Sequence, residues 1–93
     1  MKGTVYFMKT YDFTITSHRG LHAQPCSALA AIAYKSNCCV TLKYDGNEID
    51  VSNAIQMMSA SVRCGTSVTL SVSGDGEDEV MEQLKEIVTT QLL

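Results

Sequence analysis

An Asp-Gly turn between two short alternating segments is the feature that most constrains how this chain folds. Val40 and Leu42 alternate with polar residues before the turn, and Ile49 and Val51 alternate with polar residues after it. This pattern is typical of two antiparallel strands that are joined by a tight turn and bury one face. With only 93 residues, the chain has enough apolar surface for one modest core, so a single domain over residues 1–93 is expected.

The hairpin is flanked by two further strand patterns and three helix patterns. The β-branched and aromatic run over residues 4–16 predicts a strand from about Tyr11, and leaves residues 1–10 either in that strand or in an extension before it. Alternation over about 66–73 predicts the last strand. Apolar spacings of three and four predict the helices, which are expected over about 22–35, 54–59 and 77–91.

The resulting order, β-α-β-β-α-β-α, predicts an α+β fold. An antiparallel hairpin within this order favours an open-faced sandwich, in which a four-stranded antiparallel sheet carries three helices on one face. The other face of the sheet is expected to meet water because its residues are polar. Those residues are Thr41, Lys43, Glu48, Asp50, Thr69 and Ser71.

The charge distribution argues against nucleic acid as a partner. The net charge is −3 and the pI is near 5.1, so the chain offers no strongly basic face to neutralise phosphates. No apolar run is long enough to span a bilayer, and no signal peptide is visible. We therefore expect a cytoplasmic protein without membrane insertion. Its four cysteines, expected to be reduced thiols, are Cys26, Cys38, Cys39 and Cys64.

His22 is the strongest candidate for chemistry because it directly precedes a predicted helix. A helix N-terminus presents unpaired N–H groups and a partial positive charge. A phosphoryl group on His22 would accept hydrogen bonds from the N–H groups of Ala23 and Gln24, whereas Pro25 has none to give. The simpler interpretation is that His22 only caps the helix.

The motif Gly20-Leu21-His22-Ala23-Gln24-Pro25 resembles the active-site motif of the histidine-containing phosphocarrier family, HPr, of the phosphoenolpyruvate-dependent sugar phosphotransferase system. The hairpin, the short second helix and the segment 71–74 match the same family without gaps. The resemblance implies the HPr fold and a phosphoryl group that Nδ1 of His22 takes from Enzyme I and passes to a IIA domain. It implies a monomer and neither cofactor nor metal.

Gln24 and Asn53 depart from the family pattern. Gln24 stands where the family usually has an arginine that binds phosphate, and glutamine brings no charge. Arg19 lies three residues before His22, where it either supplies the missing cation or is a solvent-exposed loop residue. Asn53 occupies the position of the regulatory serine of Gram-positive members, cannot take phosphate, and is expected to cap the short helix.

The resemblance also implies a partner-docking surface beside His22, made of Ser27, Ala31, Ala54, Ile55 and Met58. Either Ile55 or Met58 can instead belong to the core. A metal set or a Cys–His catalytic pair with Cys26 is disfavoured, because Cys26 lies on the inward stripe of its helix. Two other functions stay open: a regulatory HPr paralogue that transfers phosphate poorly because of Gln24, and an unrelated small α+β ligand-binding domain.

Overall fold

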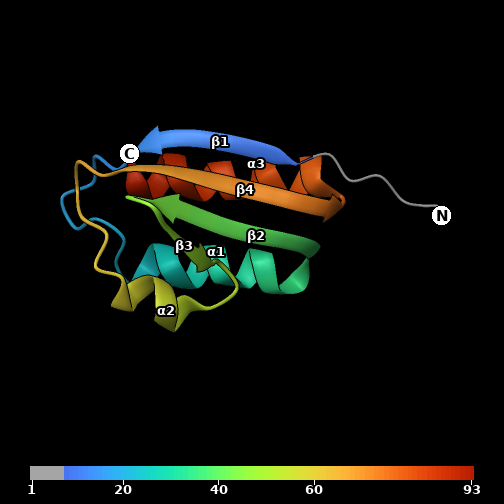
Figure 1. Ribbon diagram of the computed structural model, residues 1–93, viewed down its shortest axis with the longest axis horizontal. Coiled ribbons are helices and arrows are strands. Elements are labelled where there is room, and N and C mark those ends of the chain that lie inside the picture. Colours follow the sequence, from blue (N-terminus) through green and yellow to red (C-terminus); the bar gives the residue numbers. More distant parts are fainter. Residues whose placement is uncertain (1–7) are drawn as a thin grey trace.

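Four strands form one antiparallel sheet in the order β1-β4-β2-β3 (Figure 1). The computed structural model describes residues 8–93. The strands are β1 (Lys9–Thr14), β2 (Asn37–Tyr44), β3 (Asn47–Asp50) and β4 (Ser67–Asp75). The helices are α1 (Ala23–Lys35), α2 (Ala54–Ser59) and α3 (Glu77–Ile87), and α3 is followed by a π-helical turn, η1 (Val88–Leu92). The predicted order β-α-β-β-α-β-α is confirmed.

The β2–β3 hairpin turns at the two residues that the sequence predicts. Asp45 and Gly46 have φ angles of 46° and 79°, as a two-residue hairpin turn with positive φ at both central positions requires. The register places Leu42 opposite Ile49, and both side chains are buried. The turn therefore sets the register that points the apolar face of both strands into the core.

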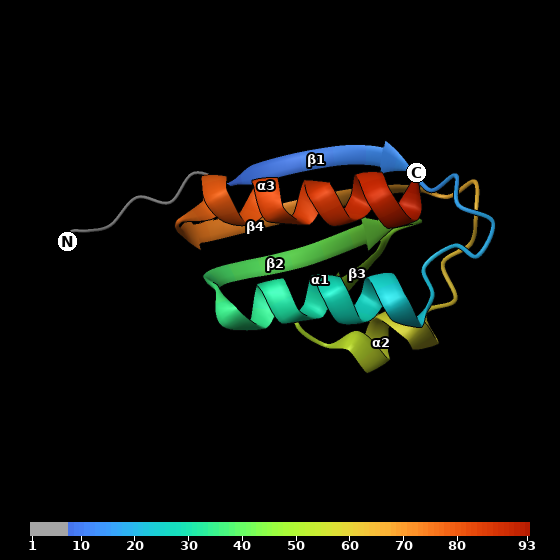
Figure 2. The same ribbon diagram turned by 180° about the vertical axis from the view of Figure 1, so that it is seen from behind.

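The helices cover one face of the sheet, as Figure 2 shows from the helix side. α1 and α3 run alongside each other over the strands, and α2 lies beside α1 at the β3 edge (Figures 1 and 2). Each element contributes apolar side chains at its own period to the core between the layers. Among the fully or almost fully buried residues are Leu29, Leu42, Met57, Leu70, Val72 and Leu84. Among residues 8–93, no helix has the length and apolar content needed to cross a membrane.

The first strand begins earlier than the expected start near Tyr11. Lys9 already pairs with Val72 of β4, and its ammonium group lies 3.0 Å from the carboxylate of Asp78. Backbone pairing with a central strand thus extends β1 to Lys9, a residue with little strand propensity of its own. The part of the expected strand over residues 4–7 lies outside the described residues.

The open face of the sheet is polar, with one correction. Asp12 accepts a 2.6 Å hydrogen bond from the hydroxyl of Thr69 on this face. Ser71 was expected to meet water, yet only 4% of it is exposed. It sits on the central strand β4, opposite Thr10 on one side and Thr41 on the other, so its short side chain lies between β-branched neighbours.

The C-terminal helix ends differently from the single helix expected over about 77–91. The α-helical pattern stops at Ile87, and the π-helical turn carries the chain to Leu92. The carbonyl of Leu92 accepts hydrogen bonds from the backbone N–H groups of Thr16 and Ser17, at 2.9 and 3.1 Å. The end of the chain thereby anchors the loop that leads from β1 towards His22.

Candidate functional site

His22 occupies the position directly before α1 and has an extended backbone, with φ −103° and ψ −175°. The first hydrogen bond within the helix runs from the N–H of Cys26 to the carbonyl of His22, at 3.1 Å. The N–H groups of Ala23 and Gln24 therefore precede the helical hydrogen bonds. His22 is thus the N-cap residue of α1, and its half-buried imidazole makes no capping hydrogen bond.

The loop before His22 is held by backbone hydrogen bonds. The N–H of Gly20 donates to the carbonyl of Ser17 at 3.0 Å, and the N–H of His22 donates to the carbonyl of Gly20 at 3.1 Å. Leu21 is buried, and its N–H donates to the carbonyl of Val62 at 2.9 Å. The backbone position of His22 is therefore fixed by hydrogen bonds that involve no side chain.

Two exposed arginines lie in the loops that meet at Gly20, and only Arg19 was expected to bear on the site. Arg19 and Arg63 are both exposed, and among residues 8–93 neither forms an ion pair. The sequence does not predict that Arg63 lies near this loop, because it follows His22 by 41 residues in the chain. The signal that finds it is the packing of its backbone against Gly20. Gln24 is exposed as well and adds amide groups but no charge.

The residues expected to dock a partner are largely exposed. Ile55 and Met58 of α2 are 72% and 37% exposed, so neither is a core residue, and the core methionine of this helix is Met57. Ser27 and Ala31 lie on the exposed side of α1, and Ala54 is partly buried. Tyr34 of α1 is also 81% exposed, and it follows Ser27 and Ala31 at helical spacing.

Asn53 caps α2, as the sequence predicts. Its side-chain oxygen accepts a 3.0 Å hydrogen bond from the N–H of Gln56. The adjacent Ser52 is tied to Asp50 instead, through a 2.7 Å hydrogen bond from its hydroxyl to the carboxylate. The start of the helix that carries Ile55 and Met58 is therefore fixed by a neutral amide.

Cys26 is separated from the chemistry of His22 by burial. Its side chain is fully buried in the core, and desolvation raises the pKa of the thiol to about 11. A thiol of this kind is neutral and poorly nucleophilic near neutral pH. Burial therefore argues against Cys26 as a catalytic partner of His22.

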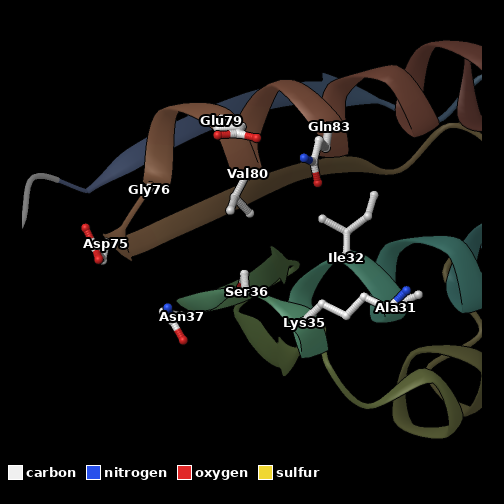
Figure 3. Close-up of a pocket in the computed structure, with 10 residues that line it drawn as sticks. All are labelled: Ala31, Ile32, Lys35, Ser36, Asn37, Asp75, Gly76, Glu79, Val80 and Gln83. Carbon is white, nitrogen blue, oxygen red and sulfur yellow. The ribbon is translucent and has the colours of Figure 1, made fainter.

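A groove of about 520 Å³ lies between the end of α1 and the start of α3 (Figure 3). Ile32 and Val80 form its apolar part, and Glu79 and Gln83 of α3 lie along its side. The groove does not include His22. His22 is half-buried at the start of α1, and the exposed apolar side chains of Ile55 and Met58 lie on α2, the helix beside α1.

Comparisons with known proteins point to one family. A family model described as the PTS HPr component phosphorylation site matches residues 9–90. The phosphocarrier protein HPr of Lysinibacillus sphaericus is 29% identical over 82 residues, which cover 88% of this chain and 93% of the relative. The solved histidine-containing phosphocarrier protein of Mycoplasma superposes with a TM-score of 0.86 at 26% identity, covering 91% of this chain and 98% of that one.

A second solved structure belongs to a protein that is described by a different role. Crh, described as a catabolite repression protein of Bacillus subtilis, is 30% identical and has a TM-score of 0.67. The match covers 87% of this chain and 88% of Crh, which is reported as a domain-swapped dimer. The same fold therefore occurs in relatives named as phosphocarriers and in a relative named for catabolite repression.

Proposed function

This chain belongs to the HPr family, and on that premise we propose that it accepts a phosphoryl group on His22 from Enzyme I and passes it to a IIA-type partner of a sugar phosphotransferase system. The observation that carries the proposal is the position of His22 directly before α1, within the segment that the family model matches. The imidazole is half-buried but has no capping partner, so it is available as a nucleophile.

Histidine suits this role because its neutral imidazole is a competent nucleophile near neutral pH. In the proposed step, Nδ1 of His22 forms a bond to phosphorus while the bond that holds the phosphoryl group on Enzyme I breaks. The phosphoryl oxygens then lie where the N–H groups of Ala23 and Gln24 precede the helical hydrogen bonds. Such a transfer needs alignment and charge stabilisation more than further covalent chemistry, and the helix start supplies both in part.

The partner-docking surface would align the donor and acceptor proteins. It combines Ser27 and Ala31 of α1 with Ala54, Ile55 and Met58 of α2, and Tyr34 extends it. Exposed apolar residues beside a reactive group favour protein partners over a free small molecule. We propose that Enzyme I and the IIA partner use this one surface in turn, with the chain acting as a monomer in the cytoplasm.

Gln24 favours a second candidate function, a regulatory HPr paralogue that binds partners but transfers phosphate weakly or not at all. Its amide donates hydrogen bonds without charge, whereas a phosphoryl group on His22 carries close to two negative charges. The 30% identity to Crh is in keeping with this alternative. The two functions differ in one measurable property, the ability of His22 to hold a phosphoryl group in the presence of Enzyme I.

The test is incubation with phosphoenolpyruvate and Enzyme I, followed by intact mass at neutral pH and after acid treatment. A carrier gains one phosphoryl group that acid removes, because phosphohistidine is acid-labile. The matched control is His18→Ala, which removes the other histidine of the same loop, at an exposed position, and leaves the label unchanged. No gain in mass in the wild type would contradict the carrier function and leave the regulatory paralogue.

A further inference from the structure

We propose that Arg63, from the loop after α2, acts with Arg19 as the cationic flank of the phosphoryl site and replaces the charge that Gln24 does not provide. The inference rests on the proposed phosphorylation of His22. It assigns Arg63 the role of a phosphate-contacting residue, although it is remote from His22 in sequence.

The first support is the direct packing of Arg63 against the loop that carries His22. A Cβ atom built on Gly20 would lie 3.0 Å from Cα of Arg63, so the two backbones touch two residues before the histidine. The adjacent hydrogen bond from Leu21 to Val62 is 2.9 Å long, and the N–H of Gly65 donates to the carbonyl of Ile15 at 2.7 Å. The two loops are thus joined on both sides of Arg63, and they run side by side in both views (Figures 1 and 2).

The second support is that both guanidinium groups are available. Arg19 and Arg63 are exposed, and within residues 8–93 no carboxylate pairs with either of them. The sequence around them is also free of acids, since residues 13–44 and 51–74 contain no Asp or Glu. These two segments hold α1, α2 and both loops. Neither segment therefore supplies a carboxylate side chain that would compete for these arginines.

The third support is the size of the effect that such an arginine exerts. A unit positive charge about 6 Å from a phosphoryl dianion in water changes an equilibrium by roughly tenfold. The backbone of Arg63 already contacts Gly20, and the long arginine side chain extends from there. Its planar guanidinium group matches the geometry of phosphate oxygens. Two such groups compensate for one missing arginine at position 24. Their effect should weaken as salt screens exposed charges.

The test phosphorylates His22 by two routes. In the first, Enzyme I and phosphoenolpyruvate supply the phosphoryl group. In the second, phosphoramidate supplies it without any protein partner: the imidazole nitrogen forms a bond to phosphorus, the nitrogen–phosphorus bond of phosphoramidate breaks, and ammonium leaves with the imidazole proton. The second route measures phosphoryl stabilisation even where docking to Enzyme I fails, so it separates this inference from the proposed function.

The variants are Arg63→Ala, Arg63→Lys and the control Lys35→Ala. Lys35 is an exposed cation at the far end of α1, about 20 Å from His22 along the helix. Lys35→Ala therefore removes one positive charge, as Arg63→Ala does, but far from His22. The fold should survive all three changes, because both side chains are exposed. Arg63 holds its loop through its backbone carbonyl, which accepts a hydrogen bond from the N–H of Thr66 at 3.2 Å. Urea unfolding verifies this for each variant.

The expected result is a roughly threefold to tenfold loss in the rate of phosphorylation for Arg63→Ala by both routes at low salt. Arg63→Lys should keep most of the rate, and Lys35→Ala should keep all of it. Wild-type rates for Arg63→Ala by phosphoramidate would overturn the proposal. An equal loss in Lys35→Ala would also overturn it, since net charge alone would then account for the effect. A wild-type His22 that phosphoramidate leaves unlabelled would overturn it as well.

Discussion

The carbonyl oxygen of Val62 lies 2.5 Å from the place that a Cβ atom would occupy on Gly20. Gly20 also has a φ of 63°, a conformation that residues with a Cβ adopt only at an energetic cost. This contact lets the loop after α2 lie against the loop before His22. The position of the imidazole therefore depends on a residue without a side chain, two positions earlier in the chain.

Gly20→Ala should lower the free energy of unfolding by about 2–4 kcal/mol, because positive φ and a backbone clash add together. The control is Gly46→Ala, which shares the positive φ, at 79°, but has open space around its Cβ position. It should cost only about 1 kcal/mol. Urea unfolding of both variants measures the difference. Equal losses would mean that the contact with Val62 relaxes without cost.

His22→Ala should abolish acid-labile labelling by phosphoenolpyruvate and Enzyme I while leaving the fold intact. The side chain makes no capping hydrogen bond, so its loss should change the free energy of unfolding by less than about 1 kcal/mol. Intact mass reports the label, and circular dichroism reports the fold. Persistent labelling of His22→Ala would remove this residue from the mechanism.

Gln24→Arg tests whether a cation is missing beside His22. If Arg19 and Arg63 already supply it, Gln24→Arg should change the rate of phosphoryl acceptance less than about threefold in the wild type. In the Arg19→Ala, Arg63→Ala double variant, Gln24→Arg should raise the rate of phosphoryl acceptance roughly tenfold. Stopped-flow transfer from phosphorylated Enzyme I provides the rates. A tenfold gain already in the wild type would show that Gln24 is an uncompensated loss.

Met58→Glu should weaken binding of Enzyme I by roughly tenfold to a hundredfold, because it places a charge among exposed apolar residues of the partner-docking surface. Gln56→Glu adds the same charge at another exposed position of α2 and should have a much smaller effect. Isothermal titration calorimetry compares the two. An equal loss in both variants would assign the effect to charge alone and not to apolar contact.

Cys26 should resist thiol reagents in the folded protein, while the exposed thiols of Cys39 and Cys64 react. Its pKa is raised from an ordinary 9.0 to about 11 by burial, so the thiolate forms first in the unfolded chain. The stabilisation from a neutral Cys26 is therefore full below pH 9 and is lost as the pH rises through 11. Mapping of labelled thiols at pH 8 checks the first point. Cys26→Ala should show a shallower loss of stability between pH 9 and 11.

Most of the fold follows from local pattern, and the exceptions have physical causes. The Asp45-Gly46 turn and the Asn53 cap use residues whose side chains or φ angles fit one local geometry, so their positions could be predicted. Lys9 joins β1 because β4 pairs with it. Ser71 is buried, although the alternation of apolar and polar residues along β4 predicts that it lies on the exposed face. Both outcomes depend on strand neighbours that local periodicity does not specify.

The candidate site divides in the same way. The position of His22 at a helix start could be predicted, because apolar spacing and Pro25 indicate where α1 begins. Arg63 could not, because its proximity to Gly20 comes from the packing of two loops that are more than 40 residues apart. The packing of these two loops depends on the sheet, α1 and α2 being in place. No periodic pattern in the sequence encodes it.

The amide of Asn53 has a consequence for control of the protein. A hydroxyl at this position would accept a covalent phosphate, and the start of α2 would then have two charge states beside Ile55 and Met58. Asn53 offers no such acceptor and holds α2 through an uncharged hydrogen bond. Residue 53 therefore offers a kinase no hydroxyl, and the charge at the start of α2 cannot change there.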